Sequence, residues 1–199
     1  MNRYEVFAEP YRGHEMSMDF RHAAWIGRFL RQIPQLSSVV EVGCCFGVST
    51  AEVLDACERT SASCTLIDTV FQQSVRSMAH SANGSVRLTM CSDHSAAVLD
   101  KYLIGGPVVI LDGDHRRSYM ELEDEILRKC PPRALILHDV SSHRLDCDGP
   151  RWMLHKWQAA GYRVAIDYLP REGERTERGL AILCATDDDA RYARHSCAE

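Results

Sequence analysis

Acidic and histidine side chains follow two apolar runs of the chain, at positions where they could do chemistry. Asp112 directly follows the run VVIL, and Asp139 follows the run ALIL and the single residue His138. Carboxylate oxygens are the ligands that hard cations such as Mg²⁺ and Mn²⁺ prefer. With His138 and Asp114 beside them, the two carboxylates could converge on such a cation. Two other interpretations stay open, since Asp114 could only cap the next helix and His138 could be a satisfied core histidine.

A glycine-bearing turn lies earlier in the chain. The segment VVEVGCCFGVST, residues 39–50, indicates a buried strand, a tight turn and the start of a helix. Gly43 can adopt backbone angles that a side chain forbids, and Gly47 lets a ligand or another backbone come close. Asp68 follows after about twenty residues, the spacing at which a carboxylate can accept hydrogen bonds from both ribose hydroxyls. The pair favours an adenosine-type ligand, although the turn could be only a tight connection and Asp68 only a strand-end residue.

Hydrophobic periodicity and breaker residues predict the elements that hold these side chains. The expected helices lie at 20–33, 50–59, 71–80, 95–103, 118–130 and 151–160, and the expected strands at 39–41, 63–68, 86–91, 108–111, 134–137, 162–169 and 179–185. Alternating strands and helices with continuous apolar strands predict an α/β fold with helices on both faces of the sheet. Ligands bind beyond the carboxyl ends of the strands in such sheets, which is where the candidate residues stand.

The predicted architecture is a doubly wound, Rossmann-like sheet of about seven strands, as expected for one α/β domain of this size. It should be mainly parallel, with an antiparallel C-terminal strand. We divide the chain into an N-terminal arm or lid at 1–20, a single domain at 21–190 and a tail at 191–199. Pro10 and Gly13 break any period in the arm, so we expect it to be irregular and to pack on the body or cover a site.

Composition narrows the function class. The chain has 199 residues, is 45% hydrophobic and 26% charged, and carries a formal net charge of -5. A mildly acidic chain argues against nucleic acid and anionic membranes as partners. The nine cysteines show no metal-binding spacing, which favours free thiols in a reducing compartment. The charged start of the sequence does not match a signal peptide, and we expect a cytoplasmic protein. The sequence leaves a homo-oligomeric state open.

From about residue 20 to 186 the sequence resembles the class I S-adenosylmethionine-dependent methyltransferases. The resemblance is carried by EVGCCFGVST (41–50), Asp68, VVILDGDH (108–115) and LILHDV (135–140). DGDH followed by a helix and a strand ending in HD is similar to small-molecule O-methyltransferases, including those that act on macrolide sugars and in aminocoumarin pathways. The implied cofactors are S-adenosylmethionine and a divalent metal, Mg²⁺ or Mn²⁺. The implied acceptor is a small hydroxylated metabolite.

The resemblance also implies roles for single residues. The implied cofactor-binding residues are Glu41, Gly43, Gly47 and Ser49 around the methionine and ribose, Asp68 at the ribose hydroxyls and Asp93 at the adenine. The implied metal ligands are Asp112, His138 and Asp139. The implied catalytic residues are Asp112 and the general base His115. Asp93 could equally be a helix N-cap. Two features depart from the usual pattern: Cys45 replaces the middle glycine of the turn, and Pro132-Arg133 replaces a glycine pair.

The implied mechanism is simple. The sulfonium donor is already activated, so the protein must mainly align an acceptor oxygen with the methyl group. A metal chelated by two neighbouring acceptor oxygens would lower the hydroxyl pKa, and His115 could take the proton. A vicinal diol, a catechol or a hydroxy-carbonyl compound is therefore expected as acceptor. Two alternatives are a metal-dependent hydroxylase on the same fold and a non-catalytic module that binds a nucleoside or the donor.

Overall fold

The computed structural model describes residues 2–141, 148–168 and 178–198, and these residues form a seven-stranded sheet. The strands are β1 (Ser38–Val42), β2 (Ser63–Asp68), β3 (Arg87–Ser92), β4 (Val108–Leu111), β5 (Ala134–His138), β6 (Arg163–Tyr168) and β7 (Leu180–Cys184). Their order is β3-β2-β1-β4-β5-β7-β6. Strands β1 to β5 pair in parallel, whereas β7 is antiparallel to both β5 and β6. The predicted doubly wound, mainly parallel sheet is confirmed.

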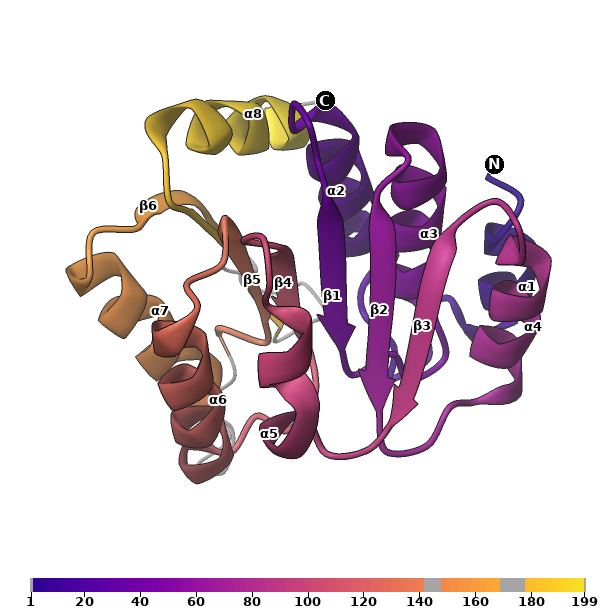
Figure 1. Ribbon diagram of the computed structural model, residues 1–199, viewed down its shortest axis with the longest axis horizontal. Coiled ribbons are helices and arrows are strands. Elements are labelled where there is room, and N and C mark those ends of the chain that lie inside the picture. The colour runs from indigo at the N-terminus through magenta and orange to yellow at the C-terminus, as the bar shows by residue number, and fades with distance from the viewer. Residues whose placement is uncertain (1, 142–147, 169–177, 199) are drawn as a thin grey trace.

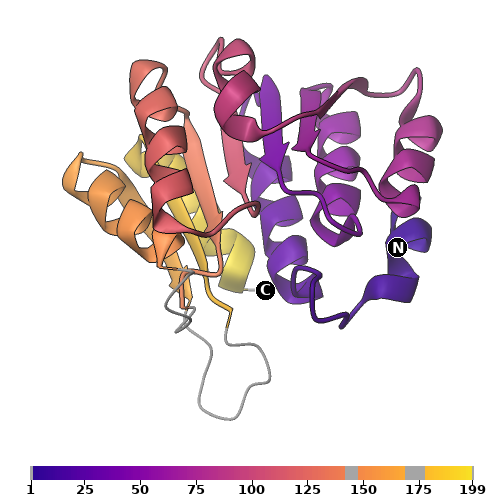
Figure 2. The ribbon, with the colours of Figure 1, turned by 90° about the horizontal axis from the view of Figure 1, so that it is seen from below.

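Helices cover both faces of this sheet (Figure 1; Figure 2). They are α2 (Phe20–Gln32), α3 (Val48–Thr60), α4 (Gln73–Ala82), α5 (Ser95–Val98), the 3-10 helix η2 (Leu99–Tyr102), α6 (Arg117–Lys129), α7 (Gly149–Ala159) and α8 (Asp187–Ala198). Alternate residues of β4 point into two core clusters: Val108 and Ile110 join the cluster with α2 and α3, Val109 and Leu111 the one with α6 and α7. Burial on both faces explains the continuous apolar runs.

The N-terminal segment differs from the irregular arm that we expected. It contains α1 (Glu5–Ala8) and the 3-10 helix η1 (Glu9–Tyr11). Asn2 Oδ1 accepts from the backbone N–H groups of Tyr4 and Glu5, both at 3.0 Å, which satisfies donors at the helix start. Tyr4 is fully buried, and its hydroxyl donates to Glu58 Oε2 at 2.9 Å. The segment packs on the body of the domain, as predicted.

The last residues also form a packed element. Residues 191–198, where we expected a tail, belong to α8. Arg28 Nε donates to the Ser196 carbonyl at 2.7 Å, which fixes α8 against α2. Arg133, which replaces a glycine of the usual pattern, donates to both carboxylate oxygens of Asp189 at 2.8 and 2.7 Å. The departure at Arg133 therefore ties the start of β5 to α8.

Two glycines shape the turn after β1. Gly43 has φ of +82°, and a Cβ there would lie 2.2 Å from the carbonyl oxygen of Asp112. Gly47 has φ of +85°, and a Cβ there would lie 2.8 Å from Met78 Cε. The packing of Met78 therefore leaves no room for a side chain at this position. Cys45 also has a positive φ, 44°, which glycine would adopt without strain. The turn therefore lies directly against the end of β4.

A buried carboxyl links β1 to α3. Glu41 is fully buried, and the Ser49 hydroxyl donates to its Oε1. Its Oε2 accepts no hydrogen bond from the residues described. Burial raises the pKa of Glu41 from its ordinary 4.5 to about 7, although the hydrogen bond from Ser49 opposes the shift.

Replacing Gly43 by alanine should destabilise the fold more than the same change at Gly84. Both glycines have a positive φ, +82° and +81°, but a Cβ at Gly84 meets nothing within 4 Å. Gly84→Ala should therefore cost only the left-handed strain, about 1 kcal/mol. Gly43→Ala should cost roughly 1–3 kcal/mol more because it collides with backbone. Urea denaturation measures both, and equal losses would show that the close approach is unimportant.

Glu41→Gln should change how stability depends on pH. The folded protein binds the Glu41 proton more tightly than the unfolded chain does, so this contribution is complete below pH 4.5 and is lost as pH rises towards 7. Relative to wild type, the glutamine variant should gain up to about 3 kcal/mol between pH 4.5 and 8. Denaturant unfolding at several pH values measures this difference. A constant difference across that range would contradict the assignment.

Candidate functional site

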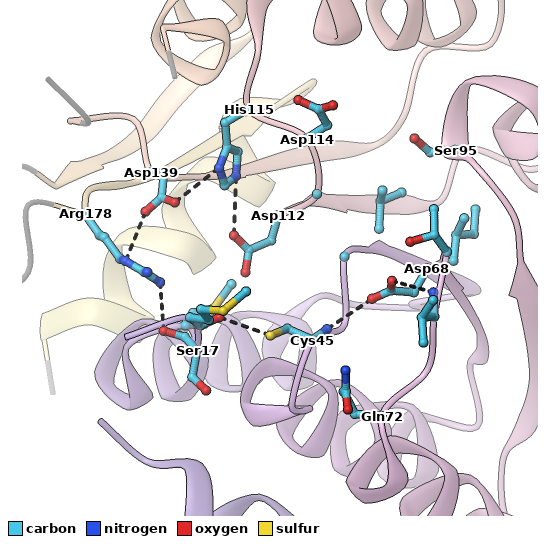
Figure 3. Close-up of a pocket in the computed structure, with 18 of the residues that line it drawn as sticks. Ser17, Cys45, Asp68, Gln72, Ser95, Asp112, Asp114, His115, Asp139 and Arg178 are labelled. Atoms are coloured by element: carbon cyan, nitrogen blue, oxygen red, sulfur yellow. Dashed lines mark hydrogen bonds and ion pairs between the residues drawn. The ribbon is translucent and has the colours of Figure 1, made fainter. Parts of the chain in front are cut away.

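A cavity of about 1130 Å³ opens beyond the carboxyl ends of β1, β2, β4 and β5 (Figure 3). This is the edge of the sheet where a doubly wound fold binds ligands. Its wall combines the N-terminal segment 13–20, the turn after β1, and the residues that follow β2, β3, β4 and β5. The residues predicted from sequence that line it are Gly43, Asp68, Asp93, Asp112, Asp114, His115 and Asp139.

The other predicted residues lie outside the cavity wall. Glu41 and Ser49 form the buried contact between β1 and α3 described above. Gly47 packs against Met78 instead of facing the cavity. His138 is fully buried behind Asp112. These four residues therefore support the wall from behind.

Asp68 shapes the glycine turn. Its Oδ2 accepts from the backbone N–H groups of Cys44 at 2.8 Å and Cys45 at 3.1 Å, and its Oδ1 accepts from Val70 N at 3.2 Å. The carboxylate at the end of β2 thereby holds the turn after β1 in place. Cys45 itself lines the cavity, and its thiol donates to the Met16 carbonyl at 3.1 Å. It therefore connects the turn to the N-terminal segment.

The Asp–His cluster, which we define as Asp112, His115, His138 and Asp139, forms at the ends of β4 and β5. These strands pair directly, which brings the two carboxylates together. His115 lies between the two carboxylates, with Nε2 3.5 Å from Asp112 Oδ1 and Nδ1 3.3 Å from Asp139 Oδ2. His138 Nδ1 lies 2.8 Å from Asp112 Oδ1 and 3.4 Å from Asp139 Oδ1. Figure 3 shows His115 directed between Asp112 and Asp139.

Charge compensation sets the protonation of the cluster. Burial alone would raise the pKa of Asp112, but His138 and His115 outweigh it and hold the pKa below its usual range. Burial alone would lower the pKa values of both histidines. The charges of Asp112 and Asp139 raise both pKa values instead, and the hydrogen bond to Asp112 adds to the shift at His138. The cluster therefore favours carboxylates beside protonated imidazoles when only protein groups are present.

The residues present fit a divalent cation. Ligand atoms of Asp112, His138 and Asp139 lie within 4.8 Å of one another. Asp139 Oδ1 is buried and accepts no hydrogen bond from the described residues, so it could serve a cation. Both carboxylates offer the oxygen donors that hard cations prefer. His138 differs from the carboxylates, because its Nδ1 could bind a metal only if its hydrogen bond with Asp112 Oδ1 were broken.

The N-terminal segment, which we expected to pack on the body or cover a site, lines the cavity, but sequence reasoning missed Arg178. Arg178 precedes β7; its Nη1 donates to the Ser17 carbonyl at 2.8 Å, its Nη2 donates to the Glu15 carbonyl, and its Nε lies 3.7 Å from Asp139 Oδ1. The ring of Phe46 stacks on Tyr11 with centroids 4.5 Å apart. No local signal separates Arg178 from the other charges of its loop, because its partners are distant in sequence.

A buried acid also supports the far end of the cavity. Ser95 and Tyr119 line the cavity, and their hydroxyl oxygens lie 3.0 Å apart. The Ser95 hydroxyl donates to Glu123 on α6, and burial raises the pKa of Glu123 to about 7. Asp93, predicted at the adenine, lines this end, where its Oδ1 accepts from His94 N at 2.8 Å. From the sequence, His143 and Asp146 belong to a polar loop that could line the acceptor site or be simply solvated, and both lie outside the described residues.

Comparison with known proteins identifies the family to which this chain belongs. A family model described as a methyltransferase domain matches residues 40–140, half of the chain. No curated protein is significantly similar in sequence. Of the helices that the structure describes, none has the length and apolar character needed to cross a membrane.

Solved structures with the same fold include a methyltransferase, a putative O-methyltransferase and a further cofactor-bound protein. A putative caffeoyl-CoA O-methyltransferase from Staphylococcus aureus has a TM-score of 0.64 at 12% identity, covering 93% of each chain. The methyltransferase PaMTH1 from Podospora anserina, bound to SAH, has a TM-score of 0.62 at 14% identity over 92% of this chain and 86% of that chain. Cofactor-bound Rv0187 from MTB has a TM-score of 0.62 at 14% identity over 91% and 87%. With the family match and the strand order, this chain belongs to the methyltransferase-domain family and has the class I fold of S-adenosylmethionine-dependent methyltransferases.

Proposed function

We propose that the protein transfers a methyl group from S-adenosylmethionine to a hydroxyl of a small metabolite, with His115 as base and with a divalent cation. The observation that carries this proposal is the placement of His115 between Asp112 and Asp139, 3.5 and 3.3 Å away, on the wall of the cavity. A proton acceptor and two cation ligands thus face the space that a donor and an acceptor would share.

The donor half of the proposal rests on the turn after β1. Gly43, Asp68 and Asp93 line one side of the cavity, which at about 1130 Å³ has room for more than one small molecule. Asp68 would lie beside the ribose and Asp93 near the adenine. The SAH-bound Podospora anserina relative supports this donor, and the putative caffeoyl-CoA O-methyltransferase supports transfer to oxygen.

His115 would perform the proton transfer. An alcohol is a poor nucleophile until it loses its proton, and an imidazole can accept that proton near neutral pH. Asp139 Oδ2 lies 3.3 Å from His115 Nδ1 and would orient the ring, while Nε2, which has no hydrogen-bond partner among the described residues, would be the nitrogen that accepts the proton. Alignment of the oxygen with the methyl group supplies the remaining rate enhancement.

Asp112 and Asp139 would hold the cation, with His138 as a further ligand if it releases Asp112. When bound, a divalent cation would lower the pKa of an acceptor hydroxyl and orient a second oxygen beside it. The acceptor is therefore a compound with two neighbouring oxygens, such as a diol, a catechol or a hydroxy-carbonyl compound. Exposed Met16 and Phe20 on the cavity wall could cover an apolar part of it.

Asp112→Asn and Asp139→Asn should each lower kcat by roughly a thousandfold, since cation stabilisation of developing charge is worth several kcal/mol. Affinity for S-adenosylhomocysteine, measured by calorimetry, should stay within about threefold. Asp188→Asn is the matched control, because Asp188 pairs with Arg191 on the surface of α8. Full activity of both variants in chelator would contradict the metal role. Turnover that requires ferrous iron and dioxygen would favour hydroxylation instead.

His115→Gln should lower kcat by about 10²- to 10⁴-fold, the usual contribution of a general base. In wild type, the rate should rise with pH through the His115 pKa, which the carboxylates place above 6.5, because only neutral imidazole accepts a proton. The variant should lack this part of the pH profile. His155→Gln on α7 serves as the control, since His155 is exposed and remote. A variant that keeps the wild-type profile would exclude His115 as the base.

A further inference from the structure

A third histidine lies behind the Asp–His cluster. His22 belongs to the first turn of α2 and is fully buried. Its Nδ1 lies 3.2 Å from His138 Nε2. The other ring nitrogen of His138 lies 2.8 Å from Asp112 Oδ1. A chain of two short contacts therefore runs from α2 through β5 to the carboxylate that follows β4.

The chemistry of imidazole restricts how this chain is protonated. Two imidazole nitrogens in hydrogen-bond contact need one donor and one acceptor. His138 Nδ1 faces a carboxylate oxygen and must carry the proton of that contact. Whether His22 Nδ1 or His138 Nε2 is the donor in their contact, His138 therefore donates Nδ1–H to Asp112.

Without His22, a second acceptor would compete for the same proton. Asp139 Oδ1 lies 3.4 Å from His138 Nδ1, only slightly further than Asp112 Oδ1. The contact at Nε2 fixes the plane of the ring and so decides which carboxylate receives its N–H. When Asp112 receives it, the buried Asp139 Oδ1 accepts no hydrogen bond from the described residues.

Helix α2 is well placed to hold His22 still. Asp19 caps the helix, its side chain accepting from Arg21 N at 2.8 Å. Helix α2 packs against α3 and α8, and the residues immediately before it line the cavity. His22 thus connects the N-terminal wall of the cavity to the reacting centre.

We propose that His22 is a positioning residue that acts through His138 to orient the Asp112 carboxylate. The proposed role in turnover rests on the methyltransferase function above. The effect of His22 on the hydrogen bond from His138 to Asp112 does not depend on that function, so it can be tested separately. Loss of a partner that orients a ligand side chain typically lowers metal affinity or activity by about 10- to 100-fold.

Three variants separate the hydrogen bond from packing. His22→Asn keeps a polar group near the position of Nδ1, whereas His22→Leu has nearly the same shape and no polar atom. His22→Gln carries the amide one carbon further out and replaces the leucine variant if that protein does not fold. Calorimetric binding of S-adenosylhomocysteine should be equal in all three and in wild type, because His22 does not line the cavity.

The first readout is ¹H–¹⁵N NMR of the His138 side chain, which needs neither metal nor substrate. Wild type and His22→Asn should show a slowly exchanging Nδ1 proton, and His22→Leu should exchange it at least tenfold faster. The second readout is methyl transfer, where kcat should fall about 10- to 100-fold in His22→Leu and stay within threefold in His22→Asn, with an unchanged donor KM. Equal proton exchange in the Asn and Leu variants would overturn the proposal. Failure of wild type to bind S-adenosylhomocysteine would instead overturn the proposed function.

Discussion

The site depends on positive groups that compensate the negative charges of two buried carboxylates, which the sheet brings close together. Asp112 and Asp139 follow adjacent parallel strands, so the pairing of β4 with β5 fixes their separation. Like charges in a poorly solvated region need partners, and His115 and His138 supply them from both sides. A divalent cation would meet the same requirement, since it also offers positive charge to both carboxylates. The requirement explains why imidazoles surround this pair.

The turn after β1 must lie directly against this cluster, and its glycine makes that approach physically allowed. Gly43 lies so close to the Asp112 carbonyl that no side chain fits, and Asp68 holds the next two N–H groups in place. The glycine turn and the acidic residues after β2 and β4 are therefore joined through direct contacts. A small change in the turn would shift Asp112 as well.

The N-terminal segment completes the cavity and is held by residues from distant parts of the chain. Arg178 donates to two carbonyl groups of this segment while its Nε faces Asp139. Phe46 on the glycine turn stacks against Tyr11. The N-terminal wall is thus coupled both to the Asp–His cluster and to the glycine turn. His22, at the start of α2, adds a third connection from the same region.

The sequence by itself determined the sheet, its mainly parallel order and the strand ends that carry Asp68, Asp112 and Asp139, because apolar periodicity and strand-end position are local properties. It did not determine that Glu41, Gly47 and Ser49 support the cavity from behind, since side-chain direction depends on packing. Nor did it show α1, η1 and α8, where tertiary contacts stabilise short or polar segments that have little helical signal of their own. The tertiary structure alone decided the partnerships of Arg178 and His22, because contacts across 161 and 116 positions leave no trace in local spacing.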